Sequence, residues 1–124
     1  MTIIEAITSA DNLKHNAFAL DIKISWLSKL DWMIKKHIID THEGASGVTY
    51  AGYTPETPLE TELLAPAPYD EMYRWWLEAQ MDLVNREIDN YNVSIIRFTE
   101  EYESFASYYN RTHMPIGSGK RFLF

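Results

Sequence analysis

The sequence predicts an all-α fold, a small bundle of about four helices with a long loop between the second and third helices. Apolar residues recur at the three- and four-residue spacing of helices along most of the chain. Glycine and proline gather in one central stretch, which rules out a continuous helix there. A length of 124 residues with 46% apolar content suits one domain with its own packed core. We therefore expect a single helical domain over residues 1–115, with the loop at 43–67, and a flexible C-terminal tail at 116–124.

The first two helices are predicted before residue 42. Thr2 and Glu5, three residues apart, form a capping-box pattern, which indicates a short helix running to about Leu13. A longer helix is expected over roughly 19–41, where apolar residues return at helical spacing. The residues of this apolar face are Leu20, Ile24, Leu27, Ile34 and Ile38.

Two large apolar side chains fall on the opposite, polar face of the second predicted helix. Trp32 and Ile39 stand seven residues apart on this face, which also carries Lys29 and Lys36. Apolar groups on an otherwise polar face contribute little to a monomer, and they can mark a contact with another protein. We therefore predict that Trp32 and Ile39 face a partner.

The predicted loop is rich in residues that interrupt helices. Residues 43–68 include three glycines and four prolines. Loops longer than about 12–15 residues without secondary structure are usually functional or disordered. Val48, Tyr50 and Tyr53 are candidates for a short extended arm or hairpin within this loop.

The third helix is predicted to begin with Pro68 as its first residue. Asp70 and Glu71 would then lie in its first turn, where the helix dipole favours acidic groups. The sequence YDEMYRWWLEAQMDLVNREI is apolar over more than half of the helix circumference, so this helix is expected to have neighbours on two sides. The turn-forming residues DNYN at 89–92 are expected to interrupt it.

The last helix is predicted from an aromatic stripe that alternates steps of four and three residues. The stripe, expected in the core, consists of Tyr91, Ile95, Phe98, Tyr102, Phe105 and Tyr109. Tyr108 lies about 100° away from Tyr109, so it is expected to face solvent or a partner. Arg111 and His113 suit the C-terminal end of this helix, and Pro115 prevents its continuation.

The charge of the chain is unevenly distributed. The formal net charge is -7, and the segment between Lys36 and Arg74 has seven acidic residues and no lysine or arginine. The charged residues after Asn110 are all basic: Arg111, Lys120 and Arg121. An acidic chain does not suit a conventional nucleic-acid-binding protein, which presents a basic surface to phosphates. The asymmetry is explained either by ordinary solvated surface or by contact between the basic tail and the acidic loop of neighbouring copies.

No motif in the chain indicates catalysis. The absence of cysteine excludes a disulfide, a thiolate nucleophile and a zinc-thiolate site, and it fits a reducing compartment. GSGK at 117–120 lacks the first glycine, the serine or threonine and the following helix of a phosphate-binding loop. His37, Asp40, His42 and Glu43 are residue types that bind metals, but a helix end whose histidines meet the last carbonyls explains them better. We expect no enzymatic activity, no cofactor and no metal.

The N-terminal region and the apolar runs predict no membrane contact. The first residues lack a basic leader, and the longest apolar runs are only a few residues. We therefore expect a soluble chain without a targeting segment.

Four segments together carry a resemblance to a known class of proteins. They are WLSKLD at 26–31, ELLAPAPYDEMYRWWLEAQMD at 62–82, NREIDNYN at 85–92 and FASYYNRTHMP at 105–115. In this combination the chain resembles small virion proteins of tailed bacteriophages and prophages of Gram-positive bacteria. Within that class it is similar to head-to-tail connector, or adaptor, proteins. The likeness extends from about residue 19 to 115 and rests on spaced aromatic and turn residues.

The resemblance implies an all-α subunit of a cyclic ring, usually a dodecamer, beneath the portal protein in the virion neck. The genome passes through such a ring without specific binding during packaging and ejection. The implied partners are further copies of the chain, the portal protein and other neck or tail proteins. The resemblance also implies assembly in the cytoplasm of the host bacterium and no enzymatic activity.

The residues that we expect at the interfaces of such a ring are of three kinds, because closed rings need different, complementary patches on each subunit. The apolar candidates are Trp32, Ile39 and Tyr108. The acidic candidates, facing a neighbour or the channel, are Glu56, Glu60 and Glu62. The basic and aromatic candidates, expected at the portal or an adjacent subunit, are Arg111, Lys120, Arg121, Phe122 and Phe124.

Three other functions remain open from the sequence. The first is a different neck or tail-completion protein with the same helices and another docking partner. The second is a helical protein-binding module that regulates an enzyme and forms no ring. The third is a metal- or DNA-dependent activity, which would require the cluster from His37 to Glu43 or the short basic tail to do more than the charge balance suggests. Self-association distinguishes the ring-forming proteins from the regulatory module, and metal content distinguishes the third function.

Overall fold

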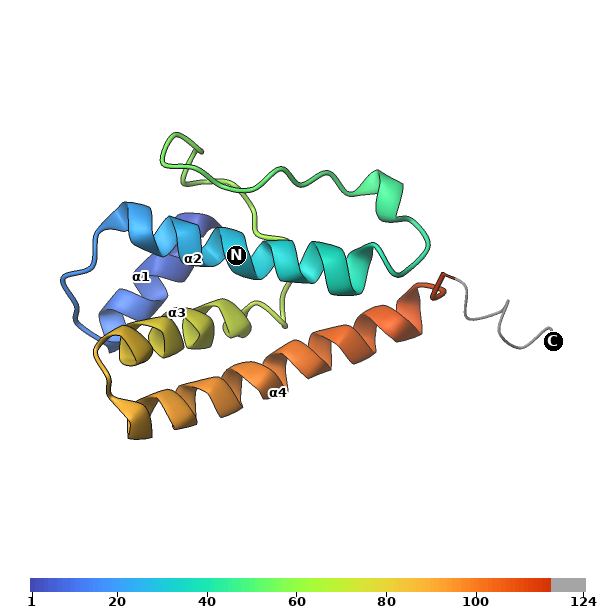
Figure 1. Ribbon diagram of the computed structural model, residues 1–124. Coiled ribbons are helices and arrows are strands. Elements are labelled where there is room, and N and C mark those ends of the chain that lie inside the picture. Colours follow the sequence, from blue (N-terminus) through green and yellow to red (C-terminus); the bar gives the residue numbers. More distant parts are fainter. Residues whose placement is uncertain (117–124) are drawn as a thin grey trace.

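The computed structural model describes residues 1–116, which form four α-helices with a long connection between the second and third (Figure 1). The elements are α1 (Ile3–Leu13), α2 (Leu20–Ile34), the π-helical turn η1 (Lys35–Ile39), the short 3-10 helix η2 (Ala45–Gly47), α3 (Glu71–Val84) and α4 (Ile88–Thr112). The described residues contain no strand, only two isolated bridges that pair Thr2 with Glu62 and His42 with Pro115. The predicted all-α bundle with a long loop is therefore confirmed. None of the helices in this part of the chain has the length and apolarity needed to cross a membrane.

The start of α1 follows from its capping box. The Thr2 hydroxyl accepts a hydrogen bond from the Glu5 backbone N–H at 3.2 Å, and the Glu5 carboxylate accepts one from the Thr2 N–H at 2.8 Å. These bonds satisfy two N–H groups that a helix end leaves without partners. They also lower the pKa of Glu5, because hydrogen bonds from Thr2 favour its charged form.

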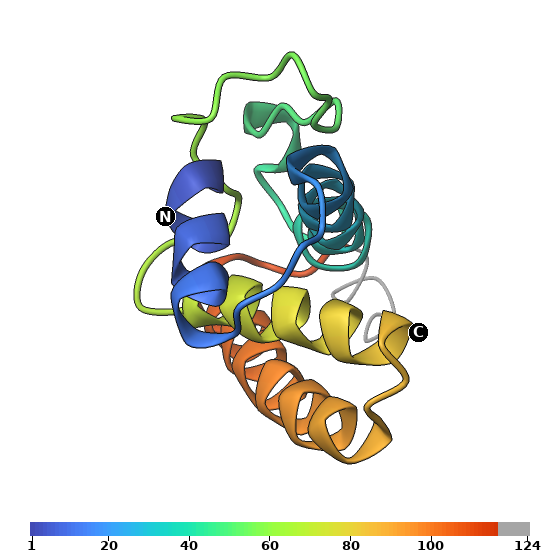
Figure 2. The same cartoon turned by 90° about the vertical axis from the view of Figure 1, so that its left-hand side faces the viewer.

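The third helix lies in the middle of the bundle. Its buried side chains face α4 on one side and both α1 and α2 on the other. Figure 2 shows α3 between the α1–α2 pair and α4. Burial on more than one side explains why its sequence is apolar over most of its circumference. The prediction that this helix has neighbours on two sides is confirmed.

The boundaries of α3 differ from the predicted ones at both ends. Pro68 belongs to a turn, and α3 begins at Glu71. The helix ends before Arg86, which has a left-handed backbone (φ 60°). In this conformation the Glu87 N–H reaches the Asp82 carbonyl at 2.8 Å, a hydrogen-bond pattern that closes a helix. The interruption therefore falls at 85–87, while the DNYN residues at 89–92 lie inside α4.

The aromatic stripe of α4 packs toward the rest of the bundle. Phe98, Phe105 and Tyr109 are buried, and the other stripe residues are half-buried. The Phe98 ring lies 5.0 Å from that of Trp76 in α3. The prediction that the stripe lies in the core is thus confirmed for Phe98, Phe105 and Tyr109.

A π-helical turn at the end of α2 overturns the predicted position of Ile39. The Asp40 N–H bonds to the Lys35 carbonyl five residues back, at 2.8 Å, instead of four residues back. A π-helical turn contains more residues than an α-helical turn. Each residue that follows is therefore rotated around the helix axis by less than α-helical spacing assumes. Ile39 is therefore buried beside Ile38, with 3% of its surface exposed, and the prediction that it lies on the outer face is wrong.

Candidate interaction surfaces

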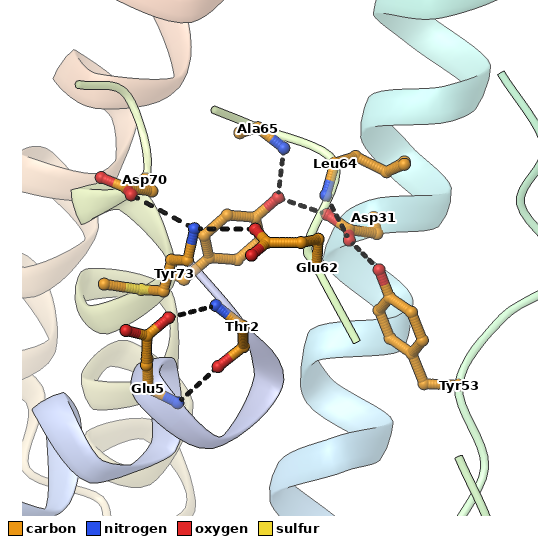
Figure 3. A network of polar contacts seen from close by, with 10 residues as sticks. Thr2, Glu5, Asp31, Tyr53, Glu62, Leu64, Ala65, Asp70 and Tyr73 are labelled. Atoms are coloured by element: carbon orange, nitrogen blue, oxygen red, sulfur yellow. Dashed lines mark hydrogen bonds and ion pairs between the residues drawn. The ribbon is translucent and has the colours of Figure 1, made fainter. Parts of the chain in front are cut away.

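A buried carboxylate fastens the long loop to the helices. Asp31 of α2 is fully buried, and it accepts hydrogen bonds from the hydroxyls of Tyr53 at 2.5 Å and Tyr73 at 2.7 Å. It also accepts one from the backbone N–H of Leu64 at 3.1 Å. Figure 3 shows these three donors converging on Asp31, with the Tyr73 hydroxyl also accepting from the Ala65 N–H at 2.8 Å. One side chain of α2 thereby holds both the loop and α3.

The environment of Asp31 disfavours its charge. No ion pair among residues 1–116 involves Asp31. Burial raises the pKa of Asp31, and the three hydrogen bonds oppose that effect only in part. Burial and the nearby Asp31 carboxylate also raise the pKa values of Tyr53 and Tyr73, so both hydroxyls keep their protons and act as donors.

Ser28 and Trp32, one turn apart on α2, give the loop a second attachment. The Tyr50 hydroxyl donates to the Ser28 carbonyl at 2.8 Å, and the Tyr53 N–H donates to the Ser28 hydroxyl at 3.0 Å. The Trp32 ring lies edge-on to that of Tyr50, 4.8 Å between centroids. At Gly52 (φ 88°) a β-carbon would stand 3.1 Å from the Trp32 indole nitrogen, so the loop passes close to the tryptophan. Trp32 is 47% exposed, and its covered part supports the loop.

The attached loop presents acidic side chains to the outside. Glu56 and Glu60 are exposed, and neither takes part in an ion pair among residues 1–116. The Glu62 carboxylate lies 3.3 Å from the Met1 amino group, while 73% of its side chain remains exposed. Backbone bonds from Ile3 to Thr61 and from Leu63 to Met1 tie this end of the loop to the start of α1. The acidic residues therefore occupy a fixed position.

A second exposed surface runs along α4, on the side opposite its buried aromatic residues. We call it the outer face of α4 and define it by the exposed residues Val93, Ile96, Glu100, Glu103, Ser104, Ser107 and Arg111; exposed Arg97 lies at its edge. Val93 and Ile96 are 58% and 59% exposed, although both are large and apolar. The polar members from Glu100 to Arg111 line a hollow of about 510 Å³ together with Tyr69.

Tyr108 is engaged within its own chain. Its ring stacks on Tyr69 at 4.9 Å with a 30° angle between the planes, and it is half-buried. The prediction that Tyr108 is free to face solvent or a partner is therefore wrong for the greater part of the ring. Arg111, in contrast, is exposed in the last turn of α4. The four remaining predicted interface residues, Lys120, Arg121, Phe122 and Phe124, lie outside the described residues.

The structure separates the residue types that could bind a metal near the end of α2. Asp40 pairs with Lys35, whereas His42 is buried with its Nδ1 atom 2.5 Å from the Ile38 carbonyl oxygen. The other ring nitrogen of His42 contacts the side-chain oxygen of Asn110. No group of three metal-binding side chains occurs within residues 1–116. The contact of His42 with the Ile38 carbonyl, near the end of the helix, agrees with the interpretation that histidines here meet the last helical carbonyls.

The sequence interpretation missed Asp31 as the anchor of the loop. Its position carried a signal, because Asp31 lies four residues after Leu27 and three before Ile34, on the apolar face of α2. An acidic residue on a core face requires hydrogen-bonding partners, and the loop supplies a tyrosine for this purpose.

The comparisons of this chain with protein-family models, with curated proteins and with solved structures found no match.

Proposed function

We propose that this chain is a structural virion protein, a head-to-tail connector that forms a ring beneath the portal. In this role it passes the genome and attaches the tail, and it carries out no catalytic step. The proposal begins from the resemblance of four segments to connector proteins. Its partners are further copies of the chain in the dodecamer that the resemblance implies, the portal protein, and other neck or tail proteins.

The observation that carries the proposal is the fixed acidic loop. Asp31, Ser28 and Trp32 hold the loop against α2, so that Glu56 and Glu60 project from one defined place. A subunit of a closed ring needs such a surface, together with a different one for the opposite neighbour. The outer face of α4 is a second exposed surface, apolar at one end and acidic in the middle. An acidic wall along a channel also repels phosphates, which lets DNA pass without binding.

The experiment that tests the proposal is a mass measurement by light scattering. The chain is measured alone, then mixed with purified portal ring from the same phage or prophage. We expect a portal-bound assembly of many copies, even if the free chain is smaller. A chain that keeps its own mass in both samples contradicts the connector function and favours the regulatory protein-binding module.

A further inference from the structure

The side chains on the outer face of α4 follow one another in a defined order of chemical type, and a ligand that binds this face must carry complementary groups in the same order. From the C-terminal end of α4 backward, it presents Arg111, two small serines, two acidic residues and two apolar residues. Its carboxylates, Glu100 and Glu103, take part in no ion pair among residues 1–116. Its apolar residues, Val93 and Ile96, are more than half exposed. A helix face with unpaired charge beside exposed apolar surface suits a partner that is basic and apolar in adjacent positions.

The chain itself contains a segment with that order. Residues 117–124 read GSGKRFLF: three small residues, two basic residues and three large apolar ones. Glu103 and Ile96 are seven residues apart, about 10 Å along a helix. Lys120 and Phe124 are four residues apart, about 13 Å in an extended chain. Because the two spacings are similar, the basic pair of the tail can reach the carboxylates while its apolar end reaches the apolar residues of the outer face.

We propose that residues 117–124 of one copy bind the outer face of α4 in a neighbouring copy. The small residues of the tail lie against Ser107, its two basic residues lie against Glu103 and Glu100, and its apolar end lies against Ile96 and Val93. This inference deepens the proposed function and rests on it, because it supplies the contact between neighbouring subunits of the ring. The two sides of the contact differ, so it can repeat from copy to copy around a ring.

The geometry at the end of α4 favours a neighbouring copy over the same chain. The Ile116 N–H bonds to the Thr41 carbonyl at 2.8 Å, and the adjacent His42 ring packs on Tyr109, on the buried side of α4. A tail in the same chain must therefore go halfway around a helix about 10–12 Å across, a path of roughly 16 Å. It must also run back about 22 Å along the helix to reach Ile96. Because the two displacements are perpendicular, the shortest diagonal path is about 27 Å long. Eight residues span at most about 27 Å when fully extended, so the tail would have no length to spare.

The contact is tested by disulfide trapping, because the chain has no cysteine of its own. Two full-length variants, Ser107→Cys and Ser118→Cys, are mixed under mild oxidation, alone and with portal. The matched control replaces Ser107→Cys by Ser25→Cys, an exposed serine of α2. Binding raises the local concentration of the two thiols, so we expect about fivefold more mixed dimer from the Ser107 pair than from the control pair. Equal yields from the two pairs in both samples overturn the proposal.

A chain that carries both cysteines distinguishes the two directions of binding. If Ser107→Cys/Ser118→Cys closes within one chain, with a yield independent of protein concentration, the tail binds its own helix and the proposed contact between copies is wrong. Charge exchange tests the pairing itself. Glu100→Lys/Glu103→Lys or Lys120→Glu/Arg121→Glu should each lower the mixed-dimer yield about three- to tenfold, and mixing the two exchanged partners should restore it. A yield that neither exchange changes overturns the ionic part of the contact.

The outcomes separate this contact from the connector function. Preferential trapping in a chain that never associates with portal supports the contact and contradicts the ring beneath the portal. Rings that assemble on portal while the Ser107 and control pairs give equal yields contradict the contact and leave the connector function standing.

Discussion

Tyr53, near the middle of the long loop, donates a hydrogen bond at 2.5 Å to the buried carboxylate of Asp31 in α2. The same carboxylate binds Tyr73 of α3 and the backbone of Leu64. Among the attachments of the acidic loop, this carboxylate is the one that holds the loop and α3 together, and it has no ion-pair partner within residues 1–116. These hydrogen bonds give the loop a defined place against α2, and their contribution can be measured.

Replacing Tyr53→Phe should destabilise the fold and loosen the loop. The change removes one hydrogen bond to a buried, charged acceptor, which costs about 1.5–3 kcal/mol of unfolding free energy. Urea denaturation measures this loss, and hydrogen exchange should show faster exchange of the amides of Tyr53 and Leu64. The matched control is Tyr50→Phe, which removes a hydrogen bond to the neutral Ser28 carbonyl and should cost about 1 kcal/mol. Equal losses from the two variants would show that the charge of Asp31 has no special part in holding the loop.

The stability of the chain should depend on pH through Asp31. Burial holds the pKa of this carboxyl above its ordinary value of 3.8, so the folded state takes up the proton more readily than the unfolded state. The resulting contribution to stability is fully present below 3.8 and is lost as pH rises through the raised pKa. The difference in unfolding free energy between the chain and an Asp31→Asn variant should therefore decrease as pH rises above 3.8. Urea denaturation of both proteins at several pH values measures this difference, and a difference that increases with pH contradicts the account.

Replacing Arg86→Gly should stabilise the fold. Arg86 has a left-handed backbone, which strains a residue with a β-carbon by about 1–2 kcal/mol relative to glycine. Glycine also has more freedom to lose on folding, so we expect a net gain of about 0.5–1 kcal/mol. Thermal and urea denaturation measure the gain. Arg86→Ala keeps a β-carbon and should give no such gain; a similar gain in both variants would assign the effect to the arginine side chain.

Ile39 and Trp32 should respond differently to truncation. Ile39→Ala removes a buried side chain and should cost about 2–5 kcal/mol of unfolding free energy. Trp32→Ala should cost less, because almost half of the tryptophan is exposed, and should mainly release the loop around Tyr50. Urea denaturation and hydrogen exchange distinguish the two effects. If Ile39→Ala leaves stability unchanged, the π-helical turn does not bury this residue in solution.

The sequence predicted the parts of the fold that depend on local spacing. The capping box at Thr2, the apolar faces of the helices and the glycine- and proline-containing break are all patterns within a few turns of one chain segment. Each of these features was confirmed, except that Leu20, which was expected on the apolar face of the second helix, is 42% exposed. The predicted location of the break between the last two helices was wrong, because the left-handed residue at that point is an arginine rather than a typical turn former.

The parts that could not be predicted depend on distant residues or on irregular turns. The donors to Asp31 are 22, 33 and 42 residues away from it, and no spacing rule connects them. The misplacement of Ile39 followed from assuming α-helical spacing through a π-helical turn. The packing of Tyr108 on Tyr69 likewise joins α4 to the turn before α3, two segments that only the folded chain brings together.

The proposed connector function is tested most directly by imaging. Purified portal rings are examined by electron microscopy before and after addition of the full chain, with the particles averaged in views along and across the ring axis. We expect a second ring of density at one end of the portal, built from repeated copies of an all-α subunit around an open channel. Portal particles that remain unchanged at a large excess of the chain would contradict this function.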